Sequence, residues 1–82
     1  MTDRISEALA AVPRRDFLPD AMRRLADEDR ALDIGYGSTC SQPWTVAYML
    51  RLLDPQPGDR VLDVGSGSGW TTALLAHLVG PT

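Results

Sequence analysis

Apolar residues recur at helical spacing in several parts of the 82-residue chain. The first such stripe repeats at i, i+3, i+4 and i+7 and consists of Ile5, Ala8, Leu9 and Val12. Thr2 is the expected N-cap of this helix, and Asp3 is favourably placed in its first turn. Pro13 is expected to end it. Residues 20–31 are rich in charge and predict a short, mostly solvated helix.

A second amphipathic stripe follows, made of Val46, Met49, Leu50 and Leu53. Ser41 is a natural N-cap for this helix, and Pro43 is tolerated in its first turn. The prolines and glycine of residues 54–58 stop the helix and predict a turn. Before it, residues 32–40 suggest an extended loop or a short strand, which the glycines weaken.

The last pattern changes from strand to helix within a few residues. Residues 61–64 form an apolar run with a single acid, Asp63, and predict a strand over residues 60–64. Gly65, Gly67 and Gly69 follow at alternate positions. Residues 71–79 then predict a helix whose inward face is Leu74, Leu75 and Leu78, with His77 on the surface. Trp44 and Trp70 are expected in the core.

The strand, glycine turn and helix start are typical of a nucleotide-like cofactor site in an open α/β sheet. Glycines allow left-handed dihedrals and the close approach of a ligand. The free N–H groups at a helix start suit a carboxylate or a phosphate. The competing interpretation is a glycine-rich turn that binds no ligand.

Composition excludes several classes of function. The net charge is −3 and basic residues form no cluster beyond two arginine pairs, so binding to nucleic acid is not expected. Cys40 is the one cysteine, which excludes an internal disulfide and a metal site built from cysteines; no metal is expected. The chain has no membrane span or signal-peptide pattern, which favours a reducing cytoplasm and no membrane partner.

The glycine spacing narrows the choice of cofactor. Trp70 stands where the dinucleotide fingerprint requires its last glycine, and no Gly-Lys-Ser/Thr follows as in a P-loop. An acid two residues before G-x-G-x-G resembles motif I of the S-adenosylmethionine-dependent methyltransferases. Such a site would offer backbone N–H groups to the carboxylate of the cofactor's methionine end, and Asp63 to its ammonium.

Three motifs in order make the resemblance more specific: VPRRDFLP, ALDIGYGSTCSQPW and PGDRVLDVGSGSGWTTALLA. Residues 12–80 resemble the N-terminal part of the protein-L-isoaspartate O-methyltransferases. Members of that family transfer a methyl group from S-adenosylmethionine to the α-carboxyl of isoaspartyl residues in damaged proteins. The resemblance implies an isoaspartyl protein or peptide as substrate and a Rossmann-like α/β fold.

The resemblance also implies site residues. Ser41 matches the serine at the family's active site, where its hydroxyl can orient the substrate carboxylate. The cofactor-binding residues would be Ser38, Thr39, Cys40, Ser41, Asp63, Gly65, Ser66 and Gly67. Cys40 stands where the family usually has isoleucine or valine, a mild departure because cysteine behaves as a small hydrophobe. The alternative role for Ser41 is the N-cap alone.

These observations predict one partial domain over residues 1–82. Residues 1–40 would be an N-terminal helical and loop segment, and residues 41–82 the start of the cofactor-binding unit, with the first strand, the following helix and an incomplete sheet. The chain alone is expected to be catalytically incomplete and to self-associate through the open strand edge. Two alternatives stay open: a related methyltransferase with another substrate, and a non-catalytic packing module.

Overall fold

The computed structural model describes residues 3–35, 37–62 and 68–80. The longer helices are α1 (Arg4–Ala11), α2 (Pro43–Leu53) and α3 (Trp70–Val79). Two 3-10 helices, η1 (Arg14–Phe17) and η2 (Asp20–Leu25), lead to the antiparallel strands β1 (Leu32–Gly35) and β2 (Ser38–Cys40). None of the helices in these ranges is long and apolar enough to cross a membrane.

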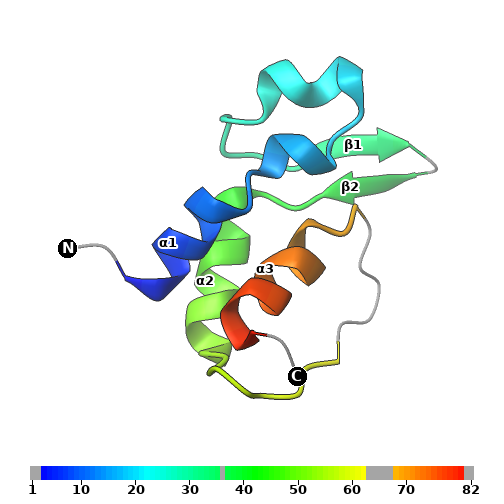
Figure 1. The fold of residues 1–82 in the computed structure, drawn as a ribbon. Helices are drawn as coiled ribbons and strands as arrows, with labels where there is room; N and C mark the ends of the chain where they lie inside the picture. The colour runs from blue at the N-terminus through cyan, green and yellow to red at the C-terminus, as the bar shows by residue number, and fades with distance from the viewer. Residues whose placement is uncertain (1–2, 36, 63–67, 81–82) are drawn as a thin grey trace.

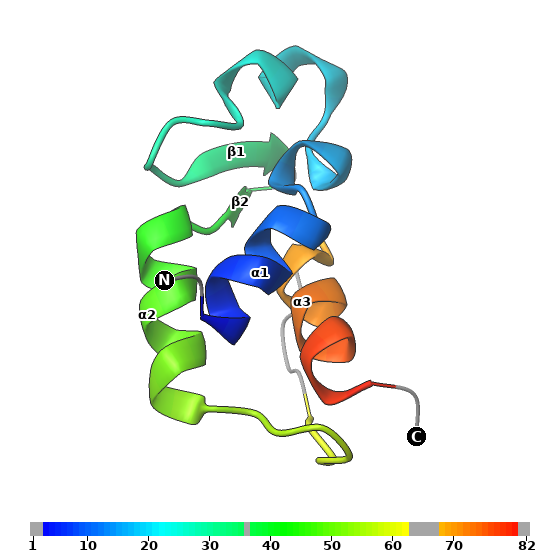
Figure 2. The same cartoon turned by 60° about the vertical axis from the view of Figure 1, so that its left-hand side comes forward.

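The three longer helices form the lower part of the molecule (Figure 1). In the turned view of Figure 2, α1 lies between α2 and α3, and it contacts both of them. The core at this junction consists of buried apolar side chains, which include Ile5, Ala8, Val46, Ala47, Leu50, Trp70, Leu74, Leu75 and Leu78. The predicted inward faces of α1 and α3 are therefore confirmed, and His77 lies on the surface as expected.

The upper part of the molecule contains η1, η2 and the two-stranded sheet (Figure 1). Leu32 pairs with Cys40, and both side chains are buried against the helices. The register shifts between Asp33 and Gly35, where the Asp33 carboxylate accepts a hydrogen bond from the Gly35 N–H at 2.9 Å. The short-strand alternative for residues 32–40 is thus correct. Residues 20–31 form a six-residue 3-10 helix and turns, less regular than the expected helix.

The helix caps correct two predictions. Asp3 is the N-cap of α1, and its side chain accepts from the Ser6 N–H at 2.7 Å; Thr2 lies outside the described residues. Gln42, and not Ser41, is the N-cap of α2. The reason is that the Asp29 carboxylate accepts the Trp44 N–H at 2.8 Å, so a distant residue satisfies the donor that a local cap would have taken.

The strand predicted over residues 60–64 is not found in its described part. Residues 60–62 form no strand, because no described strand pairs with them to share hydrogen bonds. Residues 63 and 64 lie outside the described residues. Within the described ranges, the sheet comes instead from β1 and β2.

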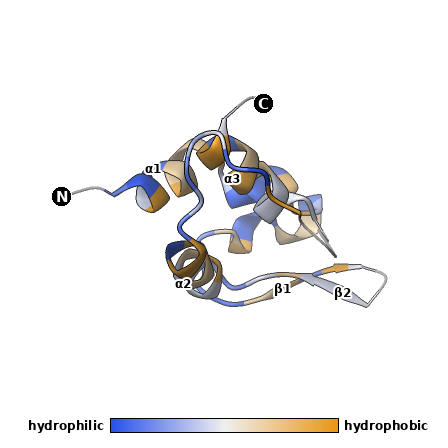
Figure 3. Ribbon diagram, turned by 90° about the horizontal axis from the view of Figure 1, so that it is seen from below, coloured by the Kyte–Doolittle hydropathy of each residue, from blue (hydrophilic) through white to orange (hydrophobic). Residues whose placement is uncertain are grey.

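The outer side of α2 is exposed and apolar, contrary to part of the predicted stripe. Val46 and Leu50 are buried, but Met49 and Leu53 are 61% and 59% exposed. Trp44 is also exposed and stacks on Tyr48 with ring centroids 5.3 Å apart, so its expected place in the core is wrong. Hydrophobic residues accordingly extend around α2 in Figure 3. This spread blurs the amphipathic pattern from which the buried side was inferred.

Candidate functional site

Two segments that the sequence analysis assigned to one cofactor site meet in the structure. The Cys40 side chain, at the end of β2, lies against Ser68, just before α3. The Ser68 Oγ is 3.5 Å from the Cys40 Sγ, although these residues are 28 positions apart in the sequence. The end of β2 and the start of α3 are also adjacent in Figure 1.

The side chains of residues 38–41 divide into one that is buried and three that are exposed. Cys40 is 2% exposed and belongs to the core, as its place among apolar family residues predicts. Ser38, Thr39 and Ser41 are exposed. Since Ser41 does not cap α2, its hydroxyl remains available to a ligand as far as the described residues show. Residues 38–40 form β2, in agreement with the short-strand alternative.

The start of α3 is held in place by Trp70. Its indole Nε1–H donates to the Val12 carbonyl at 2.9 Å, and its ring is buried, as predicted. Gly69, the N-cap of α3, has a φ of 89°, a conformation that costs glycine little. This confirms the expected left-handed backbone at the third glycine of the turn. Asp63, Gly65, Ser66 and Gly67 lie outside the described residues, so their proposed contacts remain predictions.

Arg14 is the buried polar residue that connects this region. It is 5% exposed, and its guanidinium donates to the carbonyl oxygens of Cys40 at 3.1 Å and Ser41 at 3.0 Å. It also donates to three carbonyl oxygens in the turn between η2 and β1, those of Ala26, Glu28 and Arg30. The guanidinium carbon lies 5.7 Å from the centre of the Trp70 ring, within range of a cation–π contact.

Sequence reasoning missed Arg14, Asp29 and Ser68. Arg14 was noted only in a small basic pair and as part of the VPRRDFLP motif, with no role assigned to it. Its place in that motif was the available signal, since the pattern of charges alone does not distinguish it from the exposed Arg15 and Asp16 beside it. Asp29 had no signal, because its contact with Trp44 depends on tertiary structure. In the described residues no three His, Cys, Asp or Glu side chains are grouped to hold a metal.

Comparison with known proteins decides the family. The sequence model of the protein-L-isoaspartate(D-aspartate) O-methyltransferases matches residues 1–82. The chain belongs to this family. It is 59% identical over 78 residues to the protein-L-isoaspartate O-methyltransferase of Aeropyrum pernix, which covers 95% of this chain and 30% of the relative. It is 49% identical over 80 residues to that of Methanopyrus kandleri, which covers 98% of this chain and 35% of the relative.

The fold is also shared with a solved structure. A crystal structure described as a protein-L-isoaspartate O-methyltransferase from Plasmodium falciparum, in complex with S-adenosyl-L-homocysteine, superposes with a TM-score of 0.81 at 30% identity. The match covers 96% of this chain and 36% of that one. The chain thus has the fold of the N-terminal part of the family. It spans about a third of the length of the relatives it matches.

Proposed function

We propose that the chain supplies the first part of an S-adenosylmethionine-dependent methyltransferase that acts on the α-carboxyl of isoaspartyl residues in proteins or peptides. The contact between Cys40 and Ser68 carries this proposal. It brings residues 38–41 beside the end of the glycine turn, the two segments in which the family resemblance implies the cofactor-binding residues. The proposal places the protein in a reducing cytoplasm, in keeping with its free Cys40 thiol.

The described residues fit the methionine end of such a cofactor. Ser38, Thr39 and Ser41 present exposed hydroxyl groups, while Cys40 anchors their segment in the core. The start of α3 adds N–H groups that suit a carboxylate. Asp63 would receive the ammonium, with Gly65, Ser66 and Gly67 forming the turn between them. When bound, the cofactor supplies an electrophilic methyl group.

Ser41 would then orient the substrate. A carboxylate is already a competent nucleophile, so the chain needs no general base to prepare it. A hydroxyl that donates to one carboxylate oxygen leaves the other free to face the methyl group. Holding two reactants in this way supplies much of the rate of a transfer reaction. The finding that Gln42 caps α2 supports this role, because it removes the structural alternative for Ser41.

Calorimetric titration of the chain with S-adenosylhomocysteine tests the cofactor site. Binding is expected in the unaltered chain and lost in a folded Gly67→Val variant. Ala10→Val, at an exposed position of α1, is the control for introducing a valine and should still bind. Equal binding by the Gly67→Val variant would contradict the proposed turn.

The substrate is tested in a chimera in which residues 1–82 replace the matching segment of the Aeropyrum pernix relative. Labelled methyl transfer is expected to an isoaspartyl peptide and not to the same peptide with normal aspartate. Transfer to neither, by a chimera that binds the cofactor, would favour a related methyltransferase with another substrate. A chimera that folds without binding the cofactor would favour a packing module.

For the isolated chain we propose self-association through its exposed apolar surface. The outer side of α2 contributes to this surface, and Leu62 is 87% exposed. A groove of about 610 Å³ between residues 59–61 and α3 is partly lined by Val61, Leu75 and Val79. Apolar surface of this kind is unfavourable in water. Sedimentation should show concentration-dependent dimers or larger species, and a monomer at all concentrations would contradict the proposal.

A further inference from the structure

Arg14 carries a buried positive charge that the proposed reaction does not use. None of the ion pairs among the described residues involves its guanidinium. Its charge is met by backbone carbonyl dipoles and by the face of Trp70. Burying a charge is costly unless hydrogen bonds replace the lost water. Breaking these bonds would leave the buried guanidinium unsatisfied, so the carbonyl groups are held in place as well as the arginine.

The carbonyl groups come from two segments that are separate in the sequence. The first is the turn of residues 26–30, and the shortest bond there, to the Arg30 oxygen, is 2.6 Å. The second is the Cys40–Ser41 peptide region, at 3.1 Å and 3.0 Å. Arg14 Nη2 therefore joins Arg30, Cys40 and Ser41 in one cluster. A shift of the guanidinium would move the backbone from which the Ser41 hydroxyl projects.

We propose that Arg14 is a positioning residue, which fixes residues 40 and 41 through their carbonyl oxygens and thereby sets the place of the Ser41 hydroxyl. The consequence for catalysis rests on the proposed function. The positional effect itself does not, because it concerns only contacts within the chain. Asp29 holds the residues that follow, since its carboxylate accepts from the Trp44 N–H and its carbonyl accepts from the Gln42 side chain at 3.1 Å.

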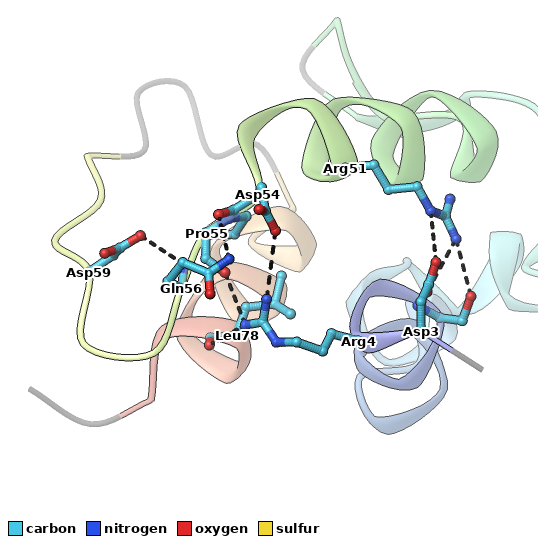
Figure 4. Close-up of polar contacts among 9 residues, drawn as sticks. Asp3, Arg4, Arg51, Asp54, Pro55, Gln56, Asp59 and Leu78 are labelled. Carbon is cyan, nitrogen blue, oxygen red and sulfur yellow. Dashed lines mark hydrogen bonds and ion pairs between the residues drawn. The ribbon is translucent and has the colours of Figure 1, made fainter. Parts of the chain in front are cut away.

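Arg4 provides a matched control within the same chain. Its guanidinium also donates to carbonyl oxygens of two distant segments, those of Pro55 at 2.9 Å and Leu78 at 3.1 Å. These contacts lie at the end of the molecule where α2 and α3 finish, away from residues 38–41 (Figure 4). A substitution at Arg4 therefore removes bonds of the same type without touching the Cys40–Ser41 backbone.

The sole cysteine makes the test direct. Cys40 is buried, so a thiol reagent labels it only when its surroundings open. The chain and its Arg14→Gln, Arg14→Lys and Arg4→Gln variants are treated with such a reagent under native conditions, and urea unfolding of each gives its global stability. After correction for global unfolding, the rate of Cys40 labelling in the Arg14→Gln variant should be about ten-fold or more above that in the unaltered chain.

The other variants decide the interpretation. Arg14→Lys keeps the charge but lacks the planar fork, so its corrected labelling rate should lie between those of the Gln variant and the unaltered chain. Arg4→Gln should show no excess over its global unfolding. Unchanged labelling in folded Arg14 variants would overturn the proposal. If circular dichroism showed that both Arg14 variants are unfolded, the proposal would also be overturned, because Arg14 would then stabilise the whole fold and not specifically the position of residues 40 and 41. No cofactor is needed, so these outcomes are independent of the proposed function.

Discussion

At each end of this molecule an arginine side chain donates hydrogen bonds to distant segments, but the two arginines differ in their exposure to water. At the end near β2, Arg14 is buried and bonds only backbone carbonyls. At the opposite end, the Arg4 side chain is 41% exposed, and it pairs with Asp54 at 3.8 Å as well as with two carbonyls (Figure 4). Both arginines thus donate hydrogen bonds to backbone carbonyls. Water is excluded from the guanidinium of Arg14, so its bonds constrain the backbone more strongly than those of Arg4, where water competes.

Substitution of Arg14 should have the largest effect on stability. In Arg14→Gln, the buried Cys40 carbonyl and four partly buried carbonyl groups lose their charged donor, and such losses typically cost about 2–3 kcal/mol. The midpoint of urea unfolding should fall accordingly. A cost equal to that of Arg4→Gln would show that the two ends do not differ.

Trp70→Phe tests the other contact at the buried end. The substitution keeps an aromatic ring beside Arg14 but removes the hydrogen bond to the Val12 carbonyl, at a cost of about 1–2 kcal/mol. Urea unfolding measures this loss. The corrected labelling rate of Cys40 should rise less than in Arg14→Gln, because the carbonyls of residues 40 and 41 keep their donor.

Arg4→Gln should have a smaller effect, below about 1 kcal/mol, because the Arg4 side chain is 41% exposed and water screens its ion pair with the exposed Asp54. Urea unfolding with and without added salt measures it. A strong salt dependence would identify the pair with Asp54 as the main contribution, whereas a large loss at every salt concentration would contradict the comparison.

The smallest effect is expected at Asp3, beside Arg4. Its hydrogen bonds from the Ser6 N–H and from Arg51 lower the pKa of its carboxyl from 3.8 to about 2. Because the pKa is lower in the folded state, Asp3 stabilises the fold above about pH 4, and this contribution is lost as the pH falls toward 2. In Asp3→Asn, urea midpoints should depend less on pH in this window; an unchanged dependence would contradict the assignment.

Sequence reasoning succeeded where local pattern decides structure. The stripes at Ile5 and Ala8, and at Leu74 and Leu78, gave the correct inward faces because helix periodicity alone determines them. The contact of residues 38–41 with the end of the glycine turn came from family resemblance, and the position of Cys40 agrees with it.

The failures share a physical cause, which is dependence on distant contacts. Ser41 has the right chemistry for an N-cap, but Asp29 satisfies the helix from another segment. The apolar character of Trp44 and Met49 says nothing about which neighbour would bury them, and both are exposed here. The burial of Arg14 could not be predicted from the pattern of charges, and its partners are backbone carbonyls, which carry no sequence signal.

The central claim is that residues 38–41 and the start of α3 form one cofactor site. Titration of the isotope-labelled chain with S-adenosylhomocysteine, followed by two-dimensional NMR, tests it most directly. The amide signals of Thr39, Ser41 and Gly69 should shift together with one common dissociation constant, while that of Gly58 stays in place. Shifts confined to one of the two segments, or a different constant for each, would contradict a shared site.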